Sequence, residues 1–170
     1  MNEIKEDVEY QRIIKDILEH SEFQKLRYIK HHDSNRLDHS LKVSYYAYRV
    51  AKKMHLNYVE VARGGLLHDF FIERTTDFDS VKDKVKLYTT GHPGEAVKNA
   101  KKHFDLTMME EDMIRCHMFP LDVHIPKYAE SWIVNLVDTA LSTKEMTLKF
   151  GYKLSYLANL YLILVLNGLK

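Results

Sequence analysis

The stretch Gly64-Gly65-Leu66-Leu67-His68-Asp69 places an imidazole and a carboxylate side by side at the end of an apolar run. At helical spacing, Val61 and Ala62 share one face with Leu66 and Leu67, which predicts a buried helix face. Placing a carboxylate and an imidazole at the end of such a face costs several kcal/mol unless an opposite charge meets them. We therefore expect a cation at this point, and further ligands for it elsewhere in the chain.

Length and composition indicate a globular protein of ordinary charge. The 170 residues suit one domain with a sizeable core, and 45% of them are apolar and 29% charged. The net charge of +1, with dispersed basic residues, gives no reason to expect nucleic acid or an anionic membrane as partner. The charged N-terminus lacks the apolar core of a signal peptide. The single cysteine, Cys116, excludes an internal disulfide and is compatible with a reducing compartment, so we expect a cytoplasmic protein.

Hydrophobic periodicity predicts an all-α, single-domain helical bundle over residues 1–170. Terminal helices are predicted at 3–20 and 152–167, and Gly151 is predicted to cap the C-terminal end of a preceding helix over 128–150. The apolar run 160–166 is too short to span a bilayer, which needs about 20 apolar residues. We expect this run to be buried, with a homo-oligomer interface or a membrane-surface contact as the alternatives.

Residues that can bind free backbone N–H groups mark the starts of the central helices. They are Ser34 or Asn35 with Asp38, Asn57 with Glu60, and Thr107 with Glu110. Gly91-His92-Pro93 marks another start, because proline is favoured early in a helix. Gly64 and Gly65 each weaken a helix by up to about 1 kcal/mol relative to alanine, so we expect a neighbouring helix, such as the one bearing His39, to approach them closely. The segment 70–88 is predicted to be a long loop that carries substrate contacts.

Four polar residues interrupt these apolar helical patterns: His39, His68, Asp69 and Asp138. Two imidazoles and two carboxylates suit Fe, Mn, Co, Ni, Zn or a labile Mg ion. His92 and His117 lie at predicted helix ends and could complete a second metal position that shares Asp69. Two metal ions about 3.5–4 Å apart can bind both the attacking and the leaving oxygen of a phosphoryl displacement.

Each of these residues also has an interpretation that needs no metal. A single histidine on an apolar face is more often a satisfied core residue than a ligand, and Asp138 could pair with an arginine or a helix N-terminus. Only the complete set, with His68 and Asp69 adjacent, favours a metal centre. Sequence spacing by itself does not establish that the helices converge.

The order of these residues resembles the HD-domain superfamily of metal-dependent phosphohydrolases, over roughly residues 34–145. The segments that carry the resemblance are Arg36-Leu37-Asp38-His39-Ser40, Gly65-Leu66-Leu67-His68-Asp69 and Val137-Asp138-Thr139-Ala140. The resemblance implies a helical bundle around one or two divalent ions, and hydrolysis of a phosphate ester or anhydride of a small molecule, often a nucleotide. It also implies a ligand set for each ion: His39, His68, Asp69 and Asp138 for the first, and Asp69, His92 and His117 for the second.

A cation is also needed to bind the phosphate and to stabilise its developing charge. Arg36, one turn before the first histidine, is the leading candidate, although a surface position or a local salt bridge is equally compatible with the sequence. Several two-metal relatives carry a lysine three residues after the motif aspartate, where this sequence has Ile72. Arg74 or Lys127 could then supply the phosphate-binding cation. His124 could add a metal ligand, with an exposed loop position as the alternative.

Three hypotheses about function remain open from the sequence. The first is a hydrolase of a small phosphorylated compound, with Asp69 and Arg36 as catalytic residues and with no nucleic-acid or membrane partner. The second is a di-iron oxygenase, because the same six ligands could hold two irons. The third is a regulatory module without activity, which the complete ligand set makes the weakest of the three.

Overall fold

The computed structural model describes residues 2–31, 34–72 and 91–168, and most of these residues are helical. The elements, in chain order, are α1 (Asn2–Glu6), α2 (Val8–Leu18), α3 (Ser21–Gln24), the 3₁₀ helix η1 (Lys25–Tyr28), β1 (Lys30–His31), β2 (Ser34–Asn35), α4 (Arg36–Lys53), α5 (Tyr58–Leu67), α7 (His92–His103), α8 (Met108–Cys116) and α9 (Ala129–Gly168). The predicted all-α fold is confirmed. The structure adds a two-residue antiparallel pair, in which Lys30 faces Asn35.

The expected capping residues begin the helices that form the centre of the molecule. Asn35, rather than Ser34, caps α4 by accepting the backbone N–H of Asp38 at 2.9 Å. Asn57 caps α5 through the N–H of Glu60, and Thr107 with Glu110 forms a complete capping box on α8. These caps satisfy N–H groups that a helix leaves unpaired at its start.

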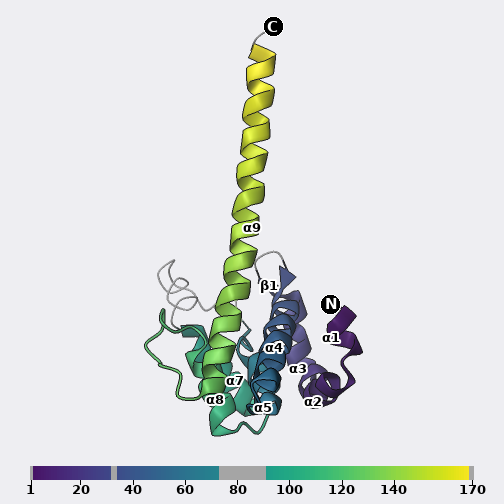
Figure 1. Cartoon of the computed structure of the whole chain (residues 1–170), viewed down its shortest axis with the longest axis vertical. Coiled ribbons are helices and arrows are strands. Elements are labelled where there is room, and N and C mark those ends of the chain that lie inside the picture. Colours follow the sequence, from purple (N-terminus) through teal and green to yellow (C-terminus); the bar gives the residue numbers. More distant parts are fainter. Residues whose placement is uncertain (1, 32–33, 73–90, 169–170) are drawn as a thin grey trace.

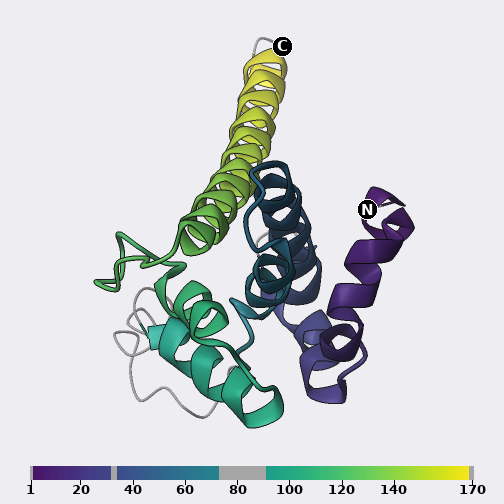
Figure 2. The same ribbon diagram turned by 60° about the horizontal axis from the view of Figure 1, so that its bottom comes forward.

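Helices α4 and α5 pack against each other at the centre, between the N-terminal helices and the pair α7 and α8 (Figure 2). Gly65 permits this contact, because a Cβ built there would lie 3.1 Å from Cα of Ser44 on α4. The same serine donates a hydrogen bond to the carbonyl of Ala62 and accepts one from Tyr10 of α2. Gly64 faces the other way, against Met113 of α8. The prediction of close approach is therefore confirmed, with a different neighbour for each glycine.

Two predictions about the helix ends are wrong. The expected helix 3–20 is divided at Asp7, whose carboxylate caps α2. Val8, directly after this division, is 80% exposed. Gly151 does not end a helix: α9 continues through it to Gly168 and extends far beyond the other described elements (Figure 1). A single glycine costs a helix only about 1 kcal/mol, which is too little to stop it without other signals.

No described helix combines the length and the apolar character that crossing a bilayer requires. Most of the predicted loop over 70–88 lies outside the described residues, which include only its first three positions. Two of those, Phe70 and Phe71, are buried.

Candidate metal centre

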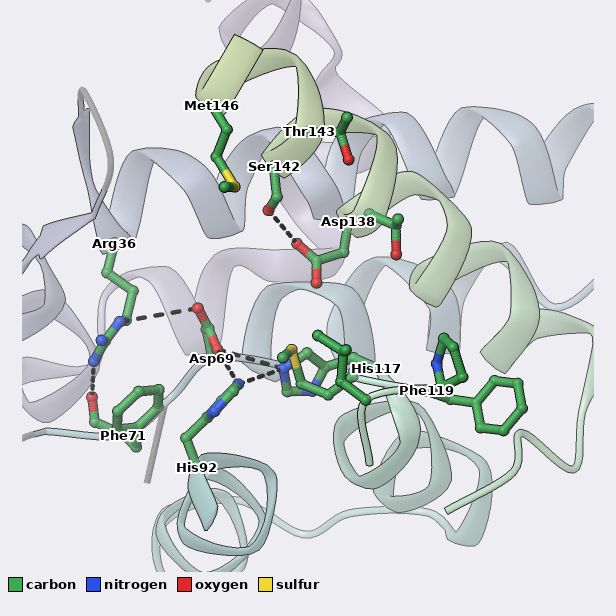
Figure 3. A pocket seen from close by; sticks show the side chains of 14 residues that line it. Arg36, Asp69, Phe71, His92, His117, Phe119, Asp138, Ser142, Thr143 and Met146 are labelled. Atoms are coloured by element: carbon green, nitrogen blue, oxygen red, sulfur yellow. Dashed lines mark hydrogen bonds and ion pairs between the residues drawn. The ribbon is translucent and has the colours of Figure 1, made fainter. Parts of the chain in front are cut away.

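The six predicted ligands come from five helices or from the residues directly after them, and Figure 3 shows four of the six, Asp69, His92, His117 and Asp138, directed toward one another. His39 lies in the first turn of α4, His68 and Asp69 directly follow α5, and His92 begins α7. The other two, His117 and Asp138, lie directly after α8 and within α9, respectively. All six are buried. The fold thus brings together residues that are up to 99 positions apart in the sequence.

These side chains form two groups that can each hold a metal ion, and both groups include Asp69. The first group is His39, His68 and Asp69, and the second is Asp69, His92 and His117; in each, the three ligand atoms lie within 4.8 Å of one another. Oδ1 of Asp69 is 3.6 Å from Nε2 of both His92 and His117. Its Oδ2 is 3.9 Å from Nε2 of His68. The carboxylate can therefore bridge the two positions.

Asp138 approaches the first group from α9. Its Oδ1 lies 2.9 Å from Nε2 of His39 and 3.8 Å from Nε2 of His68. Ser142, one turn further along α9, donates a hydrogen bond to the same oxygen at 3.3 Å. Asp138 is thus placed as the fourth member of the first group.

Two of the histidines are held in the tautomer that a metal requires. Nδ1 of His68 lies 2.8 Å from the carbonyl oxygen of Gly65, and Nδ1 of His117 lies 2.8 Å from that of Ile114. A carbonyl oxygen only accepts hydrogen bonds, so each Nδ1 carries the proton and each neutral ring presents the Nε2 lone pair to the site. Hydrogen bonds of this kind typically orient metal-binding histidines.

The Nε2 atoms are placed where they can bind a cation. Nε2 of His68 is buried, makes no hydrogen bond within the described parts of the chain, and faces carboxylate oxygens of Asp69 and Asp138. A lone pair directed at two carboxylates is unfavourable unless a positive charge lies between them. Nε2 of His92 and Nε2 of His117 are 2.9 Å apart. Two nitrogen ligands about 2.1 Å from one ion and at right angles would be separated by about 3.0 Å. The arrangement therefore fits a bound divalent ion.

The protonation states agree with this interpretation. Burial opposes ionisation of Asp69 and Asp138, but the surrounding histidines outweigh it. The pKa of Asp69 is held far below its usual value by His68, His117 and His92, together with Arg36. The pKa of Asp138 is lowered to about 2 by its hydrogen bond with His39 and by the nearby imidazoles of His68 and His117. Burial, followed by the nearby imidazoles, lowers the pKa of His117 to about 4. Ionised carboxylates and a neutral imidazole are the forms that bind metal ions.

Arg36 is buried next to the shared carboxylate and is not a surface residue. Its Nε lies 3.9 Å from Oδ2 of Asp69, and its Nη1 donates to the carbonyl of Phe71 at 2.7 Å. The guanidinium also lies over the Phe71 ring, 3.7 Å from its centre. Of the alternative cations, Lys127 is exposed and does not line the cavity described below, and Arg74 lies outside the described residues. His124 pairs with Asp122 and belongs to neither ligand group.

A cavity of about 630 Å³ opens over these residues. Arg36 and four of the ligands form its polar side, and Thr139, Ser142 and Thr143 of α9 add hydroxyl groups. The rest of the described lining is apolar: Phe71, Met118, Phe119, Pro120, Leu121 and Met146. These apolar side chains, here called the apolar wall, border the charged floor of the cavity on more than one side: Phe71 lies beside Arg36, and Met146 lies near Ser142 (Figure 3). Its volume is that of a typical small-molecule site.

Sequence reasoning missed two polar residues that support the site. Asn135, one turn before Asp138, donates hydrogen bonds to the carbonyls of His117 and Phe119, at 2.6 and 2.8 Å, and so anchors the turn that carries one ligand. Glu145 lies 3.7 Å from Nδ1 of His39. Asn135 interrupts the same apolar stripe as Asp138, and this pattern could have identified it. Nothing local in the sequence distinguishes Glu145 from a surface residue.

A comparison with family models matches the HD domain to residues 36–148. This chain belongs to the HD domain family. HD domains bind divalent metals, and the family consists mostly of metal-dependent phosphohydrolases. The matched region contains all six candidate ligands and Arg36. No curated protein and no solved structure matched the chain.

Proposed function

We propose that this HD domain is a metal-dependent phosphohydrolase that acts on a phosphate ester or anhydride of a small molecule, with nucleotides as the first class to test. The observation that carries the proposal is the shared carboxylate: Asp69 joins two buried ligand groups on the floor of a cavity, beside a buried arginine. Two adjacent positions of this kind suit phosphoryl displacement, in which charge develops on both the entering and the departing oxygen.

In this proposal, His39, His68, Asp69 and Asp138 hold one divalent ion, and Asp69, His92 and His117 hold the other. When bound, the ions supply Lewis-acid activation of water and neutralise charge on the phosphate. The carbonyl groups of Gly65 and Ile114 keep the Nε2 lone pairs of His68 and His117 directed at the site. The chain thus preorganises the ligands, which reduces the reorganisation needed during the reaction.

Arg36 has the position expected of a phosphate-binding residue. Its side chain is 2% exposed and lines the cavity next to Asp69, while Phe71 fixes it through a carbonyl oxygen and through the face of its ring. A guanidinium in a water-poor site interacts strongly with phosphate oxygens and with the extra negative charge of the transition state. We therefore assign Arg36 the role of orienting and neutralising the phosphate.

The apolar wall of the cavity supports an organic group on the substrate instead of inorganic polyphosphate. Phe119, Leu121 and Met146 offer contact area, and Thr139 and Thr143 offer hydroxyl groups for a sugar or a second phosphate. A nucleotide combines these features, because it carries an aromatic base, a sugar and a phosphate.

The test is a phosphate-release screen over nucleotides and simple phosphate esters with purified protein, after addition of Mn²⁺, Fe²⁺, Co²⁺, Ni²⁺, Mg²⁺ or Zn²⁺ in turn. Replacement of both His68 and Asp69 by alanine should abolish turnover. Asp122→Ala is the matched control, because Asp122 is an equally buried carboxylate that contacts His124 outside the ligand groups. Turnover in the double variant would falsify the proposal. The screen is run with and without oxygen, since product formation that requires oxygen would favour the di-iron oxygenase.

A further inference from the structure

Glu145 is a half-buried acidic residue that the proposed reaction does not use. It lies on α9, seven residues after Asp138, so that the two carboxylates occupy the same face of the helix about two turns apart. Its side chain is 13% exposed. One oxygen, Oε1, accepts a hydrogen bond from Nζ of Lys42 at 3.1 Å, and the other, Oε2, is fully buried.

The two carboxylates of α9 approach opposite sides of one imidazole. Asp138 lies 2.9 Å from Nε2 of His39, on the side of the metal centre, and Glu145 Oε2 lies 3.7 Å from Nδ1, on the outer side. Lys42 lies one turn after His39 on α4, and its Nζ donates a hydrogen bond to the other oxygen of Glu145. Helix α9 thus faces both nitrogens of the same ring.

This arrangement differs from that of the other oriented histidines. His68 and His117 are each fixed by a carbonyl three residues earlier in their own chain segment. For His39, the carboxylate on the Nδ1 side comes from a helix that is more than one hundred residues away in the sequence. The orientation of this ligand therefore depends on how α9 packs against α4.

We propose that Glu145 is a positioning residue for the metal centre: its carboxylate faces Nδ1 of His39, favours the tautomer that carries the proton on Nδ1, and so directs the Nε2 lone pair to the ion. Lys42 fixes the carboxylate in place. The inference rests on the proposed metal centre. A carboxylate that pairs with the outer nitrogen also raises the basicity of the inner nitrogen, which strengthens its bond to a metal ion.

The experiment measures Mn²⁺ binding by electron paramagnetic resonance of the free ion, on the full chain. Glu145→Ala should weaken binding at one of the two positions, the one that includes His39, by about 10- to 100-fold, the usual effect of losing such a partner. Glu145→Gln, which keeps an acceptor oxygen without the charge, should have a smaller effect. Lys144→Ala is the control, because Lys144 is an exposed neighbour on the same helix and its loss should leave binding unchanged.

A second readout separates positioning from simple stabilisation. In the zinc-loaded protein, the Nδ1–H proton of His39 should be visible by NMR, and it should be lost to solvent exchange in Glu145→Ala. Lys42→Met removes the ion pair but keeps the carboxylate. This variant should have a lower melting temperature, and its Mn²⁺ affinity should fall less than that of Glu145→Ala.

The outcomes distinguish the two levels of the proposal. If Glu145→Ala melts at a lower temperature but binds Mn²⁺ as tightly as the unmodified protein, Glu145 has only a structural role and this inference is wrong. If the unmodified protein itself takes up no divalent ion, the proposed metal centre fails, and the role of Glu145 fails with it.

Discussion

Replacing Gly65 by alanine tests the link between helix packing and the metal centre. Gly65 lies in α5, three residues before His68, and a Cβ there would be 3.1 Å from Cα and 3.6 Å from the backbone nitrogen of Ser44 on α4. Backbone atoms of a packed helix cannot rotate away, as the end of a flexible side chain can. The two helices must therefore separate by a few tenths of an ångström.

Two opposing effects set the magnitude. Alanine is a better helix former than glycine by about 1 kcal/mol, which favours the variant. Overpacking a close helix contact costs about 1–3 kcal/mol, and this contact is fully buried. We expect a net loss of about 1 kcal/mol in the free energy of unfolding. Because α4 carries His39 and α5 leads into His68 and Asp69, the displacement should also weaken metal binding.

The assay is urea denaturation of the metal-free protein, followed by far-ultraviolet circular dichroism, together with a divalent-ion titration. Gly151→Ala is the matched control, because Gly151 is an exposed helical glycine with nothing within 4 Å of a built Cβ. It should gain about 0.5–1 kcal/mol from helix propensity alone. If Gly65→Ala is stabilised as much as Gly151→Ala, the argument from close helix approach is refuted.

Three further predictions follow from the site. First, a divalent ion at about 100 times its Kd should stabilise the protein by about 2.7 kcal/mol, a rise of roughly 5–10 °C in Tm. Asp69→Ala should abolish this rise, and an unchanged rise would contradict a shared carboxylate. Second, His117, whose pKa burial lowers to about 4, takes up a proton in the unfolded chain before it does so in the folded one. The contribution of His117 to metal-free stability should therefore fall by up to about 3 kcal/mol as the pH drops from about 6.5 to about 4. His117→Gln should reduce that slope in urea melts, whereas an equal slope would refute the assignment. Third, Met146→Ala should raise KM for aryl phosphates about threefold to tenfold through lost apolar contact. KM for methyl phosphate should not change, and a parallel change in both would exclude Met146 from the substrate wall.

Local features of the fold, which depend on residues close together in the sequence, could be predicted from the sequence. Asn57 and Thr107 begin helices because a side-chain acceptor three residues before a free N–H group is a local feature. The buried face before His68 follows from helical spacing in the same way. The prediction that Gly151 ends a helix was wrong because one glycine destabilises a helix only slightly and no second stop signal accompanies it. Local patterns identify where helices begin more reliably than where they end.

The site could be predicted only in part, for a related reason. Buried polar residues such as His39 and Asp138 stand out against an apolar pattern, so their types and order were visible in the sequence. That their atoms come within 2.9 Å of each other depends on the packing of α4 against α9. Glu145 was missed because the sequence around it is polar, and only the fold places it beside His39. Similarly, Arg36 and Phe71 are 35 positions apart in the sequence, and only the fold brings them into contact.

The ligand arrangement has a thermodynamic consequence of its own. Because α4, α5, α7, α8 and α9 each contribute to the two groups, no single helix or hairpin can hold an ion before the helices have packed. The free energy of metal binding is then also free energy of folding. Conversely, the metal-free protein must keep Asp69 and Asp138 buried close together, where the described groups that offset their charge are histidines and Arg36. Any substitution that loosens the contact of α4 with α5 or α9 should therefore weaken metal binding, even where it touches no ligand.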